Sequence, residues 1–186
     1  ITNSKTYTWS AYNLLHTHLF IIPNTKYNPD DDASRKPKPT KTFIKQIRAY
    51  LKPRRMITGE LLIPRPEYVE IYVNATVRVP HGHKTETIKA EIEERLFRFL
   101  HPIDRGEDNR GKSWKIGEDL YIPDVFDLVR NTRAVSYVEK LDVLTDMQRP
   151  PGSVTSVRMA LDEYEIICAA PKEKFTISVL HEEEAS

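Results

Sequence analysis

The clearest pattern of apolar and polar positions in this chain lies between residues 67 and 102. From residue 68 to 79 the side chains alternate, which is typical of a long strand with one buried face. A Pro-His-Gly-His turn follows at residues 80–83, and apolar residues then recur at the spacing of an amphipathic helix of about four turns. The apolar set is Val69, Ile71, Val73, Ala75, Val77 and Val79 on the strand and Ile88, Ile92, Leu96, Phe99 and Leu100 on the helix.

A second amphipathic helix is predicted from residue 40 to residue 52. Thr40 stands where an N-cap is expected, and Pro53 stops the helix. A third helix is expected to begin at Pro123, where the missing N–H of proline costs nothing. The apolar face of the second helix carries Phe43, Ile44, Ile47, Tyr50 and Leu51, and that of the third carries Val125, Phe126 and Val129.

Shorter apolar runs predict further strands, and polar segments rich in proline separate them. The segment 28–39 contains three prolines and three consecutive aspartates, so we expect an irregular connection there. In the run 135–143, every second residue is expected on one face of a strand: Val135, Tyr137, Leu141 and Val143 are apolar, and Glu139 breaks this alternation. The expected strands are residues 14–22, 59–63, 135–143, 154–159, 164–169 and 175–180.

This order of elements predicts an α+β protein, compatible with split βαβ (ferredoxin-like) sandwich modules and a small C-terminal β appendage. We expect an N-terminal strand-loop-helix-strand module at residues 1–64 and a central α+β module at 65–146. A linker and the appendage then fill 147–186. The chain begins at Ile1 without an initiator methionine, which indicates a piece of a longer polypeptide.

Composition places the chain among soluble globular proteins, with 186 residues, 39% hydrophobic and 30% charged. No apolar run is long enough to span a membrane, and the first residues lack the pattern of a signal peptide. The single cysteine, Cys168, excludes an internal disulfide and lies in an apolar run typical of an inert buried thiol.

A search for catalytic or metal-binding groups finds little. Two histidine pairs could each offer two metal ligands: His81 with His83, and His16 with His18. Neither pair has a cysteine or carboxylate at the fixed spacing that a zinc site would show. Exposed histidines are therefore favoured over a metal site, and a metal-dependent enzyme using His81 and His83 is only a third possibility. Neither glycine-rich phosphate loops nor paired catalytic carboxylates are recognisable. We expect no enzymatic activity, no small-molecule substrate and no cofactor.

The strongest charge feature is the segment 35–55, which has nine basic and no acidic residues although the net charge of the chain is only +1. The tail carries matching acids, including Glu182 and Glu184, so contacts with partners or neighbouring copies are favoured over nucleic acid. A nucleic-acid-binding ferredoxin-like domain using this segment is the alternative. Tyr68 and Tyr72 resemble the stacking aromatics of an RRM strand, without the glycine-aromatic pattern of that family. The candidate interface residues are Arg35, Lys36, Lys38, Lys45, Arg48, Lys52, Arg54, Arg55, Tyr68 and Tyr72.

A series of short motifs over about two-thirds of the chain resembles the C-terminal part of baseplate J-like proteins, which are wedge components of phage tails and contractile injection systems. One departure stands at residues 133–135, where the family commonly has a glycine before its last strand and this chain has Arg-Ala-Val. The carrying motifs are KPT at 38–40, YLKPRR at 50–55, PEYVEIYV at 66–73, FLHP at 99–102, WKIG at 114–117 and YVE at 137–139.

The resemblance implies a structural, non-catalytic protein that works through protein-protein contacts during virion assembly. It implies partners among other baseplate proteins and copies of the chain itself, in an oligomer around the tail tube. Assembly is expected in the cytoplasm, after which the protein is part of a phage virion or a tail-like particle. The resemblance covers residues 19–143, so it implies nothing for residues after Pro150.

Overall fold

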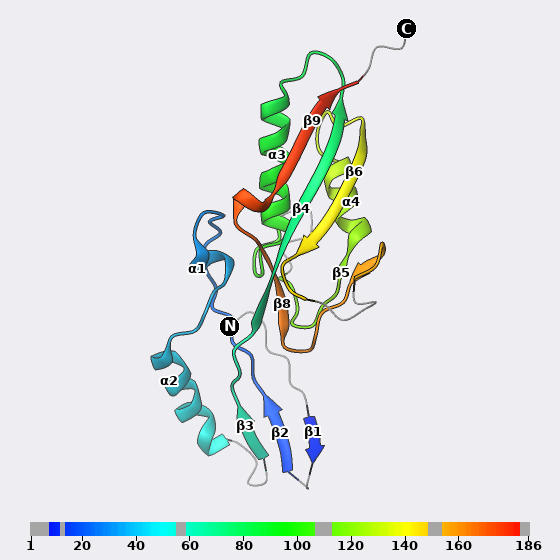
Figure 1. Ribbon diagram of the computed structural model, residues 1–186. Coiled ribbons are helices and arrows are strands. Elements are labelled where there is room, and N and C mark those ends of the chain that lie inside the picture. Colours follow the sequence, from blue (N-terminus) through cyan, green and yellow to red (C-terminus); the bar gives the residue numbers. More distant parts are fainter. Residues whose placement is uncertain (1–7, 12–13, 55–58, 107–112, 149–153, 183–186) are drawn as a thin grey trace.

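The long strand predicted between residues 68 and 79 is the centre of the computed structural model, which describes residues 8–11, 14–54, 59–106, 113–148 and 154–182 (Figure 1). In this strand, β4 (Glu67–Val79), half-buried and buried residues alternate from Tyr68 to Val79. All six predicted inward residues are buried, Val73 with 0% exposure. The prediction from the alternating pattern is therefore confirmed.

The main sheet is built around β4 on both of its edges. Strand β6 (Tyr137–Thr145) pairs antiparallel with residues 71–78 of β4. On the other edge, β8 (Glu165–Ala169) pairs parallel with residues 67–71, and β9 (Thr176–His181) pairs parallel with residues 74–79. A 3₁₀ turn, η3 (Lys172–Lys174), separates β8 from β9. Two strands thus follow one another along a single edge of β4.

The C-terminal segment is not the separate appendage that the sequence predicted. Both of its longer strands pair with β4, and every residue of β8 is buried. The apolar side chains of Ile166, Ile167 and Ile177 belong to the same core as β4. Local patterning predicts that these strands exist, but the choice of partner depends on contacts nearly a hundred residues away in sequence. Only the short β7 (Arg158–Met159) lies apart, paired with β5 (Leu120–Tyr121).

Two helices cover the buried face of the main sheet. Helix α3 (Thr85–Phe99) lies against β9, α4 (Ile122–Arg130) lies against β6, and the two helices contact each other (Figure 1). Proline stands in the first turn of α4, as predicted. Trp114 links the end of α3 to the following segment, because its indole N–H donates to the carbonyl oxygen of Phe99 over 2.9 Å. The mixed α+β class is confirmed, while the ferredoxin-like description of the modules and the boundary at residue 64 stay predictions.

A β-bulge explains the broken alternation at Glu139. Thr76 pairs with Lys140 and Val77 pairs with Val138, so Glu139 is the extra residue of β6. The bulge brings Val138, Leu141 and Val143 onto the core side. Tyr137, predicted to share that side, instead stands opposite Arg78 and is 50% exposed.

The N-terminal part forms a second, smaller sheet. Strand β2 (Leu14–His18) pairs antiparallel with β1 (Thr8–Ala11) and parallel with β3 (Gly59–Leu62). The predicted strand 14–22 is therefore too long, although residues 20–22 are buried. Helix α2 (Lys41–Leu51) and the 3₁₀ turn η1 (Lys52–Arg54) connect β2 to β3, beside β3 in Figure 1.

The segment 28–39 is more ordered than its composition predicts. It contains the short helix α1 (Asp32–Arg35), capped by the Asp31 side chain, which accepts a hydrogen bond from the Ala33 amide over 3.0 Å. Ser34 and Arg35 are buried. Polar side chains that bond to the backbone, rather than apolar periodicity, stabilise this segment.

Candidate interaction surfaces

The first two residues of the basic segment are engaged inside the molecule. Arg35 is 8% exposed, donates from Nη1 to the carbonyl oxygen of Ala169 over 3.2 Å, and pairs with Asp32 at 3.0 Å. Lys36 forms ion pairs with Glu70 of β4 and with Asp32. These contacts attach α1 to the main sheet, so Arg35 and Lys36 contribute little to an outer surface. Arg55 lies outside the described residues.

The remaining basic candidates surround α2. Lys38, Lys45, Arg48, Lys52 and Arg54 are all exposed. Thr40 caps the helix as predicted, with its hydroxyl oxygen accepting from the Phe43 amide over 3.2 Å. No residue of α2 is buried, even though the predicted apolar face is present. On that face Phe43, Ile44, Ile47 and Leu51 are half-buried, and only Tyr50 is exposed.

Tyr50 stands out on this helix because it is large, apolar and 62% exposed. The guanidinium carbon of Arg54 lies 4.0 Å from the centre of the Tyr50 ring. Arg54 also donates from Nη1 to the Tyr50 carbonyl oxygen over 2.8 Å. The cation above the ring and the hydrogen bond hold both side chains in one arrangement at the C-terminal end of α2.

Tyr68 and Tyr72 do not form a stacking platform. Both are half-buried, and the Tyr68 hydroxyl donates to the carbonyl oxygen of Pro37 over 2.5 Å. Burial raises the pKa of Tyr68 above its ordinary value of 10.0. Tyr72 lies beside the ammonium group of Lys174, which is 5.9 Å from its ring centre. Their contacts fit the packing role expected of aromatic residues on a strand face.

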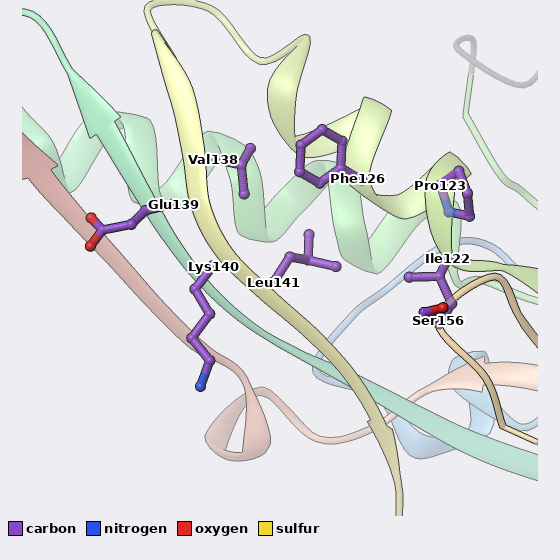
Figure 2. Close-up of a pocket in the computed structure, with 8 residues that line it drawn as sticks. All are labelled: Ile122, Pro123, Phe126, Val138, Glu139, Lys140, Leu141 and Ser156. Atoms are coloured by element: carbon purple, nitrogen blue, oxygen red, sulfur yellow. The ribbon is translucent and has the colours of Figure 1, made fainter.

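An apolar groove lies between α4 and the bulged strand β6 (Figure 2). Its volume is about 340 Å³, and it is open to solvent along one side. Figure 2 shows Phe126 of α4 facing Val138 and Leu141 of β6, while Glu139 and Lys140 extend away from these apolar side chains. The bulge at Glu139 places Val138 in this groove.

Sequence reasoning missed a buried serine–histidine contact. His101 is 2% exposed, and its Nε2 lies 3.3 Å from the hydroxyl of Ser34. Its Nδ1 accepts hydrogen bonds from the amides of Ile103 and Asp104, at 3.3 and 2.9 Å. The ring proton therefore resides on Nε2 and points to Ser34, so this imidazole cannot remove the hydroxyl proton. Burial lowers the pKa of His101, and the contact ties α1 to the end of α3.

The other candidate groups are placed as follows. Cys168 is fully buried, as predicted, and burial raises its pKa to about 12. His81 and His83 are exposed on the turn after β4. The ring of His81 is stacked on that of His181, with the ring centres 5.2 Å apart, and Nδ1 of His18 lies 3.0 Å from the Tyr164 hydroxyl.

Within the described ranges, no three His, Cys, Asp or Glu side chains gather as metal ligands. Likewise, none of the described helices has the length and apolar character needed to cross a membrane.

Comparisons with known proteins show a likeness of fold to a solved structure. No family model matches the sequence, and no curated protein matches it. Among solved structures, the chain is similar to a protein chain in the 6-fold symmetrised cryo-EM structure of the anti-feeding prophage baseplate. The TM-score is 0.52 and the sequence identity 12%; the match covers 90% of this chain and 30% of the baseplate chain. At this identity the likeness shows a shared fold.

Ala134 adds a structural detail at the position where the sequence departs from the baseplate J-like pattern. Its φ angle is 64°, in the left-handed region that favours glycine. Among the described residues other than glycine, no other has a positive φ. The turn before β6 thus has the backbone of a glycine turn, although the residue is alanine.

Proposed function

We propose that this chain is a structural, non-catalytic component of a contractile tail-like baseplate. The carrying observation is the likeness of fold to a chain of the anti-feeding prophage baseplate over 90% of the present sequence. The motif series from residue 38 to residue 139 supports the finer proposal that the chain is the C-terminal part of a baseplate J-like wedge protein. The glycine-type backbone at Ala134 supports it too.

The proposed partners are other baseplate proteins and copies of this chain. The exposed members of the basic segment, together with the open groove of Figure 2, are the surfaces offered for such contacts. The finished location is a virion or tail-like particle assembled in the cytoplasm. Assembly through several modest surfaces requires a rigid core more than a catalytic centre, and the single apolar cluster around β4 provides that rigidity.

The test is to tag the full-length gene at its own locus and purify particles by sedimentation. We expect the protein to sediment with sheath and tube proteins and to be lost from the sedimenting fraction when the sheath and tube genes are deleted. Deletion of the tagged gene itself is expected to abolish complete particles, as seen by negative-stain microscopy. Normal particles in the deletion strain, or a protein found only in unassembled fractions, would show that the proposal is wrong.

A further inference from the structure

The segment 26–38, which includes α1, lies against the main sheet and the end of α3, on the connection between β2 and α2 (Figure 1). We propose that this segment is a strap that opens while the core stays folded, and that its open form presents Arg35 and Lys36 to an acidic surface of a partner protein. Opening depends on this chain alone. Only the identification of the partner as a baseplate neighbour rests on the proposed function.

The strap is attached to the main body mainly through polar contacts. None of its residues belongs to the buried apolar cluster of the core, and Tyr27 packs against that cluster from outside. Polar contacts contribute little net free energy, because water replaces them when they open. A segment held in this way opens at a lower free energy than the core. Its contacts include Asp30 with Lys172 at 2.6 Å, Ser34 with His101 at 3.3 Å, and Arg35 with the Ala169 carbonyl oxygen at 3.2 Å.

Arg35 makes the closed form costly. Its side chain is only 10% exposed, and its Nη1 and Nη2 donate to the Ala169 carbonyl oxygen and to Asp32. Its Nε, however, is buried and has no hydrogen-bond partner among the described residues. A buried donor without a partner loses free energy that water restores on exposure. Closing the strap therefore carries a penalty that opening removes.

Opening changes the charge that the strap offers to a partner. In the closed form the Lys36 ammonium is paired with Glu70 and Asp32, and the Arg35 guanidinium is buried. The open form adds both cations to the exposed lysines that follow them in the sequence. A partner that binds the open form more tightly than the closed form shifts the strap toward opening by that difference in affinity.

The charge pattern of the strap favours a protein over nucleic acid as the partner. Residues 30–32 are exposed aspartates that stand close before Arg35 and Lys36. These carboxylates repel a uniform chain of phosphates, whereas a protein surface can place basic groups beside its acidic groups. We therefore expect a partner surface on which acids lie next to bases.

Cys168 is a built-in reporter of opening. It is the single cysteine of this sequence, is fully buried, and stands beside Glu70 in the pairing of β4 with β8. Burial is the largest influence on the pKa of its thiol and raises it, while the nearby charges of Lys36 and Arg35 lower it. Both cations belong to the strap, which therefore lies against the thiol. A reagent reaches Cys168 when the strap opens or when the core unfolds.

The experiment measures how fast N-ethylmaleimide, an uncharged reagent, modifies Cys168 in the purified full-length protein. Mass spectrometry follows the peptide that contains this residue. Lys36→Gln removes the ion pair with Glu70 and is expected to accelerate labelling at least about fivefold. Ser34→Ala, which removes the contact with His101, is expected to act in the same direction. The matched control, Lys140→Gln, removes a 2.9 Å lysine–aspartate pair on β6 and is expected to leave the rate unchanged.

Urea separates opening of the strap from unfolding of the core. Opening exposes little surface, so the labelling rate is expected to change little at low urea and to rise steeply only where the protein unfolds. Circular dichroism and the melting temperature verify that each variant is folded under the labelling conditions. A rate that follows global unfolding at every urea concentration overturns the strap. So does a rate that neither Lys36→Gln nor Ser34→Ala changes.

A synthetic peptide with a block of lysines followed by a block of glutamates tests the partner. We expect it to accelerate labelling of the wild-type protein, and a scrambled peptide of the same composition to have no effect. No acceleration by the block peptide overturns the acidic protein partner. Acceleration by a duplex oligonucleotide instead overturns it in favour of nucleic acid.

The labelling and the particle experiment separate the two proposals. If the strap opens with the core folded but the protein stays out of particles, the baseplate role is wrong and the strap stands. If the protein enters particles but its labelling follows only global unfolding, the strap is wrong and the baseplate role stands.

Discussion

Ala134 carries a backbone conformation that its side chain disfavours. A left-handed conformation costs an L-residue about 1–2 kcal/mol, whereas glycine adopts it freely. Part of this gain is offset by the greater freedom of glycine in the unfolded chain. We therefore expect Ala134→Gly to raise the free energy of unfolding by up to about 1 kcal/mol, measured by urea denaturation.

Ala90→Gly is the matched control for this substitution. Ala90 is exposed within α3, where glycine in place of alanine costs about 1 kcal/mol. The same chemical change is thus expected to have opposite signs at the two positions. Destabilisation by both would contradict the positive φ at Ala134.

His101 makes stability depend on pH in the mildly acidic range. Its ordinary pKa is 6.5, and burial lowers it in the folded protein. Above pH 6.5 both states hold a neutral ring, and the folded state has its full stability. As the pH falls below 6.5, the unfolded chain binds a proton that the folded chain does not, so the free energy of unfolding decreases by at most about 1.4 kcal/mol per pH unit.

The variant His101→Asn isolates this contribution, because its amide oxygen can replace Nδ1 as the acceptor for the two amides but does not titrate. We expect its free energy of unfolding to fall less than that of the wild type between pH 7 and pH 5. His83→Asn, on an exposed turn, is expected to keep the wild-type slope. If the free energy of unfolding falls equally with pH in His101→Asn and in the wild type, His101 is not the cause of the pH dependence.

At the scale of elements, α2 is expected to open and close independently of the main core. Thr40→Ala removes the hydroxyl that accepts from the Phe43 amide, which costs a helix about 1 kcal/mol. Because α2 buries no residue, this loss is expected to increase opening of α2 without lowering global stability. Hydrogen exchange is expected to accelerate about fivefold in α2 and to be unchanged in α3.

Thr42→Ala is the control for the cap, since Thr42 is exposed in the first turn and caps nothing in the described contacts. Equal acceleration in α2 by both variants would show that the threonine hydroxyl at residue 40 has no special role. A drop of the global melting temperature with Thr40→Ala alone would show that α2 is coupled to the main core.

The elements that could be predicted from sequence are those whose pattern is local. The alternation of β4, the helical spacing of α3 and the Thr40 cap each depend on residues close together in the chain. Glu139 was recognisable as a break, but only the pairing with β4 shows that it is a bulge that turns Tyr137 outward. The contact between His101 and Ser34 left no signal, because it joins residues 67 positions apart through polar atoms.

At the scale of the molecule, the chain closes its core only after residue 154. Strands β8 and β9 supply the parallel partners along one edge of β4. The ring of Phe97 of α3 packs tilted against Phe175, which lies between these two strands, with the ring centres 4.5 Å apart. The amide of Ala170 donates to the carbonyl oxygen of Ile71 over 2.9 Å, and that of Glu182 donates to Val79 over 2.9 Å. The apolar pattern could not predict that β8 and β9 pair with β4, because several strands in this chain have a similar pattern and could pair with the same edge.

A chain that ends at residue 147 tests this closure. Without β8 and β9, one edge of β4 and the apolar side chains packed beside it are exposed to water, so we expect the shortened protein to lose cooperative thermal unfolding and to bind the dye ANS. A peptide of residues 154–182 added in trans is expected to restore a cooperative transition, whereas a scrambled peptide of the same composition is not. A separate appendage would leave the shortened chain folded, with a transition within a few degrees of the full chain. Calorimetry of the two chains therefore decides whether the last strands complete the core or merely follow it.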